Sequence, residues 1–330
     1  MTLFFENKQV LVTGAGGFIG SELVKQLHLQ GAQVRAFLRY TSQAEKGLLK
    51  FFPQSIQDDL EFVFGDLRDP DAVQRASKDV DIIFHLGALI SIPYSYVHPV
   101  EVVQSNVIGT LNVLQACRAV GCRLVHTSTS EVYGTAQVVP IDEGHPLQGQ
   151  SPYSASKIGA DKLVESYYRA FDVQAVTLRP FNTYGPGQSA RAVIPTIITQ
   201  ALNRDEIHLG NLDARRDFTY LSDTVDGFIR AGLADEAVGE TINLGYGEDI
   251  SIRELVNLVV ALVGRPLKIV VDEERLRPEK SEVMRLQSDN NRARVLLGWE
   301  PKVNFRQGLQ ETISWVKEHI DLYRVGIYEK

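Results

Sequence analysis

The glycine-rich segment GAGGFIG, residues 14–20, constrains the fold of this chain more than any other stretch. It follows the apolar run QVLVT and precedes the helical pattern IGSELVKQLHLQG, which Gly31 ends. In a turn between a strand and a helix, glycines let backbone N–H groups and the helix N-terminus approach a pyrophosphate. Glycine turns also occur for conformational reasons alone. The strand before and the helix after this one favour a dinucleotide site.

Further apolar runs alternate with helical periodicity, as parallel strands joined by crossover helices do. Most of these runs are apolar throughout, as expected of strands that are covered on both faces. The pattern therefore predicts an α/β fold with a doubly wound parallel sheet. The five strands expected after the first helix are residues 32–39, 60–66, 80–88, 123–130 and 173–181.

The rhythm of the chain changes after Pro180. We expect a dinucleotide-binding domain over 1–180, completed by about 217–246, and a smaller α/β lobe, mainly substrate-binding, over 181–330. Within these later residues the patterns predict a helix, a strand and a terminal amphipathic helix. The long segment 140–152 is expected to form a wall of the cleft. The three predicted elements are residues 192–203, 242–247 and 305–320.

Composition excludes several classes of protein. The 330 residues are 44% hydrophobic, enough for a large core, and the net charge of −7 disfavours a nucleic-acid surface. No apolar run approaches the roughly 20 residues that span a bilayer, and the N-terminal residues lack the pattern of an export signal. We expect a soluble, cytoplasmic protein without a membrane partner.

Two cysteines, Cys117 and Cys122, are the only ones in the chain. We expect both in one helix, in packing roles, because two residues provide neither a disulfide framework nor a zinc ligand set. The sequence therefore predicts no metal site and a reducing compartment.

The ends of the second and third strands bear on the cofactor. Asp66 in GDLRD is placed to accept a hydrogen bond from an adenine amino group, or is an exposed turn residue. An acidic acceptor for the ribose 2′-hydroxyl usually follows the glycines by about 20 residues, but RAFLRYTS offers Arg39, Tyr40 and Ser42. This favours NADP slightly over NAD, unless Arg39 is solvated or stacked on the adenine.

The segment SPYSASK predicts a helix start, with Ser151 as the cap and Pro152 in the first turn. Tyr153 and Lys157 then lie four residues apart on one face of the helix. The ammonium group stabilises the phenolate and lowers its pKa from about 10, so that the tyrosine can take a proton from a sugar hydroxyl. A hydroxyl at the preceding strand end, Ser128 or Thr129, supports this interpretation.

These motifs resemble the extended short-chain dehydrogenase/reductase family, in its branch of nucleotide-sugar epimerases and dehydratases. The resemblance covers nearly all of the chain and rests on GAGGFIG, GDLRD, HLGA, NVIGTLNVL, STSEVYG, YSASK, RPFNTYGP, RDFTYLSD and LGWEP. It implies a Rossmann domain that binds NAD(P). The implied cofactor residues are Gly14, Gly17, Phe18, Ile19, Gly20, Arg39, Asp66, Leu67, Leu86 and Ala88, together with Tyr153 and Lys157.

The same resemblance implies roles for other residues. Asn106 would bend its helix and hold a water molecule, and Thr129 would place its hydroxyl beside Tyr153. A nucleotide-sugar substrate would be bound by Asn182, Arg216 and Arg277, although either arginine is alternatively a surface charge. The family also implies a homodimer formed through the helices that carry Asn106 and Tyr153.

Glu131 in STSEVYG decides between reactions. Once C4 of a sugar is oxidised to a ketone, the C5 proton becomes acidic, and a base at C5 allows loss of the C6 oxygen. Glu131 is the acidic side chain of the motif able to act there, with Ser130 or Glu131 itself assisting departure of water. The hydride then returns to C6, so the cofactor is recycled and stays tightly bound. A glutamate that only caps a turn is the alternative.

The resemblance also separates the branches of the family. Sugar 4,6-dehydratases share a glutamate like Glu131, whereas simple 4-epimerases usually lack it and UDP-glucuronate decarboxylases have a similar run. Three segments, PLQGQSPYSASKIGAD, RPFNTYGPGQSARAVIPTIITQ and RLRPEKSEVMRLQSDN, resemble UDP-N-acetylglucosamine 4,6-dehydratases of the legionaminic-acid type. Gly187 departs from the pattern, because many relatives carry arginine there. The sequence predicts a 4,6-dehydratase, with decarboxylase, 4-epimerase and a non-enzymatic NAD(P) sensor as alternatives.

Overall fold

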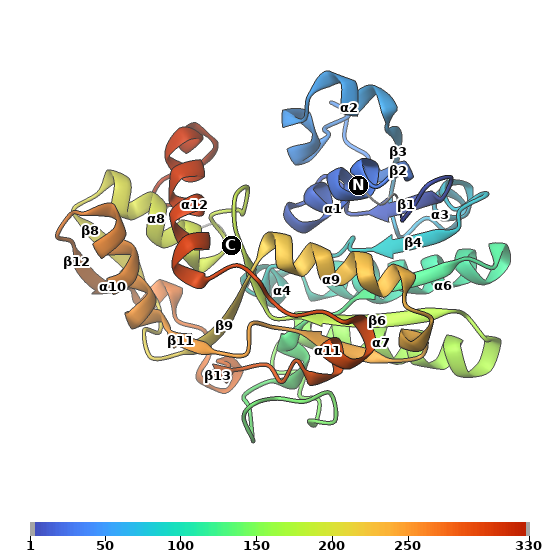
Figure 1. Cartoon of the computed structure of the whole chain (residues 1–330). Helices are drawn as coiled ribbons and strands as arrows, with labels where there is room; N and C mark the ends of the chain where they lie inside the picture. Colours follow the sequence, from blue (N-terminus) through green and yellow to red (C-terminus); the bar gives the residue numbers. More distant parts are fainter. Residues whose placement is uncertain (1–3, 328–330) are drawn as a thin grey trace.

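A parallel sheet of seven strands forms the centre of the molecule in the computed structural model, which describes residues 4–327 (Figure 1). The strand order is β10-β6-β5-β4-β1-β2-β3, and every neighbouring pair is parallel. This confirms the doubly wound α/β fold. The strands are β1 (Gln9–Thr13), β2 (Gln33–Arg39), β3 (Glu61–Gly65), β4 (Ile82–His85), β5 (Arg123–Thr127), β6 (Ala175–Pro180) and β10 (Thr241–Leu244).

Helices cover both faces of this sheet, which explains why strands such as β4 and β6 are buried along their whole length. On one face α1, α9 and α11 pack through residues such as Leu23, Phe228 and Leu297. On the other, α3, α6 and α7 pack through residues such as Val113 and Val164. These helices are α1 (Phe18–Leu29), α3 (Pro70–Ala76), α6 (Gly109–Val120), α7 (Pro152–Phe171), α9 (Leu221–Leu233) and α11 (Asn291–Leu297).

Shorter helices connect these layers. They are α2 (Gln54–Asp59), α4 (Ile92–Val97) and α5 (Pro99–Val103), with 3-10 helices at Gly47–Phe51 and Ser130–Tyr133 and a π-helical turn at Gln104–Ile108. Among residues 4–327, no helix has the length and apolar character needed to cross a membrane.

A smaller lobe lies beside the sheet and has its own core, which includes Ile197, Leu255 and Leu309 (Figure 1). Its central strand β9 pairs with β7, β11 and β13, while β8 pairs with β12. The strands are β7 (Asn182–Tyr184), β8 (Glu206–Leu209), β9 (Arg215–Tyr220), β11 (Asp249–Ser251), β12 (Lys268–Val271) and β13 (Arg285–Leu286). The helices are α8 (Val193–Asn203), α10 (Ile252–Val263) and α12 (Phe305–Glu318).

Two local expectations were wrong. The strand predicted over 123–130 ends at Thr127, so the residues after it are free to form a tight turn. Cys122 does not share a helix with Cys117, because Gly121, with φ of 72°, ends α6 between them. Both cysteines are free and buried, in agreement with packing roles.

Candidate active site

The glycine-rich turn joins β1 to α1 with very little space for side chains. Gly14 has φ of 71°, and a Cβ on Gly20 would lie 2.2 Å from the carbonyl oxygen of Gly14. The first helical turn contains Phe18 and Ile19 and has no acidic residue. Its N-cap residue is Gly17, which has no side chain with which to cap the helix. The backbone N–H groups and the positive end of the helix dipole therefore suit a pyrophosphate.

The ends of β1, β3 and β4 converge beside this turn. The N–H of Leu86 donates to the carbonyl of Thr13 (3.2 Å), and Ala88 follows two residues after Leu86. A Cβ on the intervening Gly87 would lie 2.7 Å from Leu67 Cδ1. The structure thus brings together the apolar residues that were predicted for the cofactor.

The side chains at the ends of β2 and β3 are held in ion pairs. Arg68 donates hydrogen bonds from Nε and Nη2 to the Asp66 carboxylate, with Nη2 and Oδ2 2.6 Å apart. These bonds lower the pKa of the Asp66 carboxyl group. Arg39 is largely exposed, and its Nη2 lies 3.5 Å from Oε1 of Glu101 on α5. Sequence reasoning missed Glu101, which lies more than 60 residues away. Its charge offsets part of that of Arg39.

The 3-10 helix Gly47–Phe51 lies over the glycine-rich turn and also reaches the smaller lobe. The N–H of Leu48 donates to the carbonyl of Gly16 (2.9 Å). A Cβ on Gly187 would lie 3.1 Å from Leu48 Cδ1, and Gly187 has φ of 87°. The rings of Phe51 and His319 lie edge to face, 6.2 Å apart. Gly187, where many relatives carry arginine, therefore provides room for Leu48.

Tyr153 and Lys157 lie in the first turns of α7, which begins as predicted after the cap residue Ser151, and the structure adds a capping box between Ser151 and Ser154. Both side chains are buried, 7% and 4% exposed. The expected lowering of the Tyr153 pKa by Lys157 is not found, because burial raises that pKa, and a hydrogen bond with the Thr129 hydroxyl opposes the rise. Burial lowers the pKa of Lys157 to about 8, and its Nζ donates to the carbonyl of Thr127 (2.5 Å).

Glu131 lies in the 3-10 helix that follows β5. The cap of this helix is Thr129, whose hydroxyl accepts from the N–H of Glu131 (3.2 Å), so the carboxylate of Glu131 is not used as the cap. Burial lowers the pKa of Arg216, and the negative charge of Glu131 opposes that shift. The same charge adds to the rise that burial causes in the pKa of Tyr153. Ser130 is buried beside it, 3% exposed.

Three polar residues predicted for the substrate come from the smaller lobe. Nη2 of the buried Arg216 lies 3.5 Å from Oε1 of Glu282, and Nη1 of Arg277 lies 3.8 Å from the same oxygen. Nη1 of Arg277 and Oδ1 of Asn182 are buried without a hydrogen-bond partner. Such atoms are rare unless a ligand or water satisfies them. The residues present therefore fit a polar ligand.

Asn106 lies in the π-helical turn, and this irregularity agrees with a helix-bending residue. Its Oδ1 accepts from the N–H of Leu89 (2.8 Å), and its Nδ2 donates to the Leu89 carbonyl (2.9 Å) and to Ser156 Oγ (2.9 Å). The side chain thus ties the loop after β4 to α7. The role of holding a water molecule stays a prediction.

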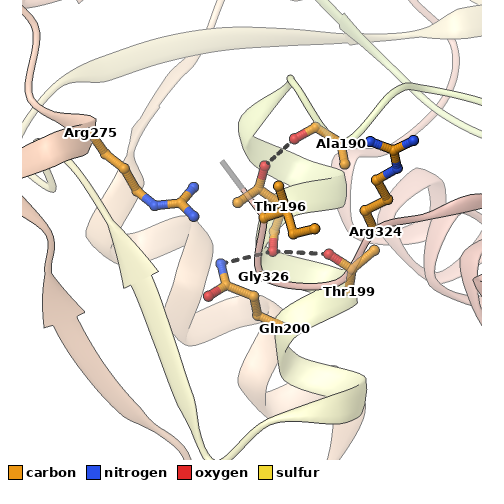
Figure 2. A pocket seen from close by; sticks show the side chains of 8 residues that line it. Ala190, Thr196, Thr199, Gln200, Arg275, Arg324 and Gly326 are labelled. Carbon is orange, nitrogen blue, oxygen red and sulfur yellow. Dashed lines mark hydrogen bonds between the residues drawn. The ribbon is translucent and has the colours of Figure 1, made fainter. Parts of the chain in front are cut away.

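A small cavity in the smaller lobe lies between α8 and the C-terminal segment (Figure 2). Its volume is about 10 Å³, room for at most one water molecule. Thr196 and Gln200 donate to the carbonyls of Ala190 and Thr196. This cavity contains none of the predicted site residues. Within the described part of the chain, no group of three metal-ligating side chains occurs either.

Comparisons with known proteins agree with this geometry. Residues 11–312 match the family model described as GDP-mannose 4,6 dehydratase. A UDP-glucose 4-epimerase of Mycolicibacterium smegmatis is 34% identical over 94% of this chain and 98% of its own. UDP-glucuronic acid decarboxylase 1 of Xenopus tropicalis is 30% identical over 96% of this chain and 74% of its own.

A solved structure with a similar fold is that of a double mutant of DesIV, a dTDP-glucose 4,6-dehydratase from Streptomyces venezuelae with NAD bound. It superposes with a TM-score of 0.87 at 29% identity, covering 96% of this chain and 98% of its own. The relatives thus include dehydratases, epimerases and decarboxylases. The chain belongs to the extended short-chain dehydrogenases/reductases, in the nucleotide-sugar family that the GDP-mannose 4,6-dehydratase model describes.

Proposed function

We propose that this protein is a nucleotide-sugar 4,6-dehydratase, with UDP-N-acetylglucosamine as the first-choice substrate. The observation that carries the proposal is the place of Glu131 in the 3-10 helix after β5, beside the cap residue Thr129, with a carboxylate that is not used as the cap and whose charge acts on both Tyr153 and Arg216. A base placed between a proton-accepting phenol and a phosphate-binding guanidinium suits elimination from a bound sugar nucleotide.

The first step requires a proton acceptor at the C4 hydroxyl. Tyr153 takes this proton, and the Thr129 hydroxyl opposes the rise that burial causes in the pKa of the phenol. The Lys157 ammonium, one turn along α7, would favour the phenolate form. A bound nicotinamide dinucleotide would supply the hydride acceptor for C4 and the hydride donor for C6. The glycine-rich turn and the residues around Leu67, Leu86 and Ala88 would hold it.

The second step requires a base at C5 and a proton for the departing oxygen. Glu131 removes the C5 proton, which the C4 ketone has made acidic, and Glu131 or Ser130 assists loss of the C6 hydroxyl as water. Arg216 and Arg277 hold the diphosphate, and Asn182 contacts the same end of the substrate. When the hydride is added at C6, C5 takes up a proton, for which the one that Tyr153 removed from the C4 hydroxyl is available. The product is a 4-keto-6-deoxy sugar nucleotide.

Incubation with UDP-N-acetylglucosamine, UDP-glucuronate and UDP-glucose, read by mass spectrometry, tests this proposal. A product lighter by about 18 mass units from the first sugar is expected, because water is lost. A loss of about 44 mass units from UDP-glucuronate identifies a decarboxylase, which the relatives of that activity make the second candidate. Unchanged mass with a new C4 configuration identifies an epimerase. Cofactor binding without any reaction identifies a sensor.

Arg39 leads us to propose a modest preference for NADP over NAD. The end of β2 lacks an acidic acceptor for the 2′-hydroxyl, and a guanidinium there attracts a 2′-phosphate. Because the Glu101 carboxylate partly neutralises the Arg39 guanidinium, we expect NADP⁺ to bind only several-fold more tightly than NAD⁺. Arg39→Ala should weaken NADP⁺ binding and leave NAD⁺ binding nearly unchanged, as measured by calorimetry. Equal losses for both cofactors would contradict the preference.

We also propose a homodimer. The helices near Asn106 expose an apolar stripe that includes Val100, Val103 and Ile108, which are 68%, 44% and 42% exposed. Exposed apolar groups of this kind mark contact surfaces. Sedimentation should give twice the chain mass, and Val100→Glu with Ile108→Glu should shift the protein towards the monomer. A wild-type monomer at micromolar concentration would contradict the proposal.

A further inference from the structure

Helix α7 carries three buried ionisable side chains at a spacing of four residues. Tyr153, Lys157 and Asp161 are 7%, 4% and 6% exposed, and their spacing places them on one face of the helix. The proposed reaction uses the first two. Asp161 lies one turn beyond Lys157, where a buried carboxylate requires partners.

The carboxylate of Asp161 is hydrogen-bonded on both oxygens to the end of β5 and to β6. Oδ1 lies 3.2 Å from Nε2 of His126. Oδ2 accepts from Ser128 Oγ (2.8 Å) and from Nε and Nη2 of Arg179 (3.2 and 3.0 Å). Ser128 lies immediately before Thr129, and His126 lies three residues before it. Asp161 therefore fixes the segment that presents the Thr129 hydroxyl to Tyr153.

The charged and titratable groups around Lys157 come from several elements. They are Tyr153 and Asp161 on α7, His85 on β4, His126 on β5 and Arg179 on β6, with Glu131 and Tyr133 in the 3-10 helix after β5.

This buried cluster contains two cationic side chains, Lys157 and Arg179, and the Asp161 carboxylate acts on both. Burial keeps the pKa values of His85 and His126 below their usual range, so both rings are neutral near pH 7. Burial also disfavours the Lys157 ammonium, while the charge of Asp161 opposes that effect. Without Asp161, the positive charge of Arg179 would add to the cost of charging Lys157.

We propose that Asp161 is a positioning residue of this site: its carboxylate holds Lys157 in the ammonium form and fixes the end of β5 against α7. The inference rests on the proposed function for its catalytic meaning. Lys157 is charged below its pKa and loses that charge as the pH rises. A loss of Asp161 therefore moves the loss of the ammonium to lower pH and weakens the assistance to Tyr153.

A simpler role for Asp161 is to neutralise Arg179, which lies buried beside it. The two roles predict different behaviour of Lys157. If Asp161 only neutralised Arg179, replacing both residues with uncharged ones would leave the Lys157 pKa unchanged or raise it. If Asp161 supports Lys157, the same double replacement lowers the pKa, because the carboxylate acts on Lys157 more strongly than the guanidinium does.

The experiment is an NMR titration of lysine side chains labelled with ¹³C at Cε, in the full-length protein, with Lys157→Arg to assign the resonance. Asp161→Asn should lower the Lys157 pKa by about one unit or more. The alkaline limb of kcat should move by the same amount. Because this variant leaves Arg179 unpaired and can fail to fold, Asp161→Asn with Arg179→Met is the second variant, with a smaller decrease expected.

Val164→Ala is the matched control, because it disturbs the buried face of α7 without removing a charge. It should lower Tm and leave the Lys157 pKa in place. An unchanged or raised Lys157 pKa in the double variant would overturn the inference. The titration needs no sugar nucleotide, so a shifted pKa together with inert wild-type protein would reject the proposed dehydration and retain the role of Asp161.

Discussion

Glu131→Gln is expected to lower the rate of dehydration by about 10³-fold, because glutamine cannot take the C5 proton. The amide has nearly the same size as the carboxylate, and the N–H of residue 131 still donates to Thr129. The helix Ser130–Tyr133 should therefore keep its shape. The rate is measured as formation of the 4-keto-6-deoxy product.

Oxidation at C4 does not depend on Glu131, which gives this variant a distinctive signature. The reduced cofactor should accumulate when substrate is added, and its near-ultraviolet absorbance reports it. Glu22→Gln on α1 serves as a control for the change of charge, since the hydrogen bonds of the Glu22 side chain join it to its helix neighbours Lys25 and Gln26 and to none of the proposed catalytic residues. Turnover by Glu131→Gln at the wild-type rate would remove the basis of the dehydratase assignment.

Tyr153→Phe is expected to lower kcat by about 10³- to 10⁴-fold, because the acceptor of the C4 hydroxyl proton is lost. The ring is buried and phenylalanine fills nearly the same volume, so the fold should persist. Unlike Glu131→Gln, this variant should accumulate no reduced cofactor, because it fails before hydride transfer. Stopped-flow absorbance and product mass together distinguish the two.

The two variants also test the order of the steps. If Tyr153→Phe accumulated reduced cofactor as Glu131→Gln does, the phenol would act after oxidation, and another group would take the first proton. Calorimetry with the sugar nucleotide provides the control, since both variants retain Arg216 and Arg277 and should bind it with nearly wild-type affinity.

The sequence predicts the sheet well because buried parallel strands and their helices have strong patterns. Continuous apolar runs predict β1 to β6, and Ser151 followed by Pro152 predicts the start of α7. The smaller lobe was harder, because strands such as β11 (Asp249–Ser251) and β13 (Arg285–Leu286) have two or three residues and no resolvable period. Tertiary pairing with β9 decides their conformation.

The residues of the candidate site also fall into two groups, those that local sequence motifs predict and those that such motifs do not. Tyr153, Lys157 and Glu131 lie in local motifs that the sequence displays. Glu282 and Glu101 were missed because each pairs with an arginine that is distant in sequence, Arg216 and Arg39 respectively. Asp161 left a local signal, since it continues the spacing of four from Tyr153 and Lys157, but its partners on β5 and β6 appear only after folding.

The position of the 3-10 helix Gly47–Phe51 bears on where the hydrogen removed from C4 of the sugar goes during turnover. It contacts Gly16 in the glycine-rich turn and Gly187 in the other lobe. A dinucleotide bound at that turn would be retained between oxidation and reduction if these contacts had to separate for its release. We expect deuterium placed at C4 of one sugar to arrive at C6 of that same molecule, with no crossover between labelled and unlabelled substrates in a mixture.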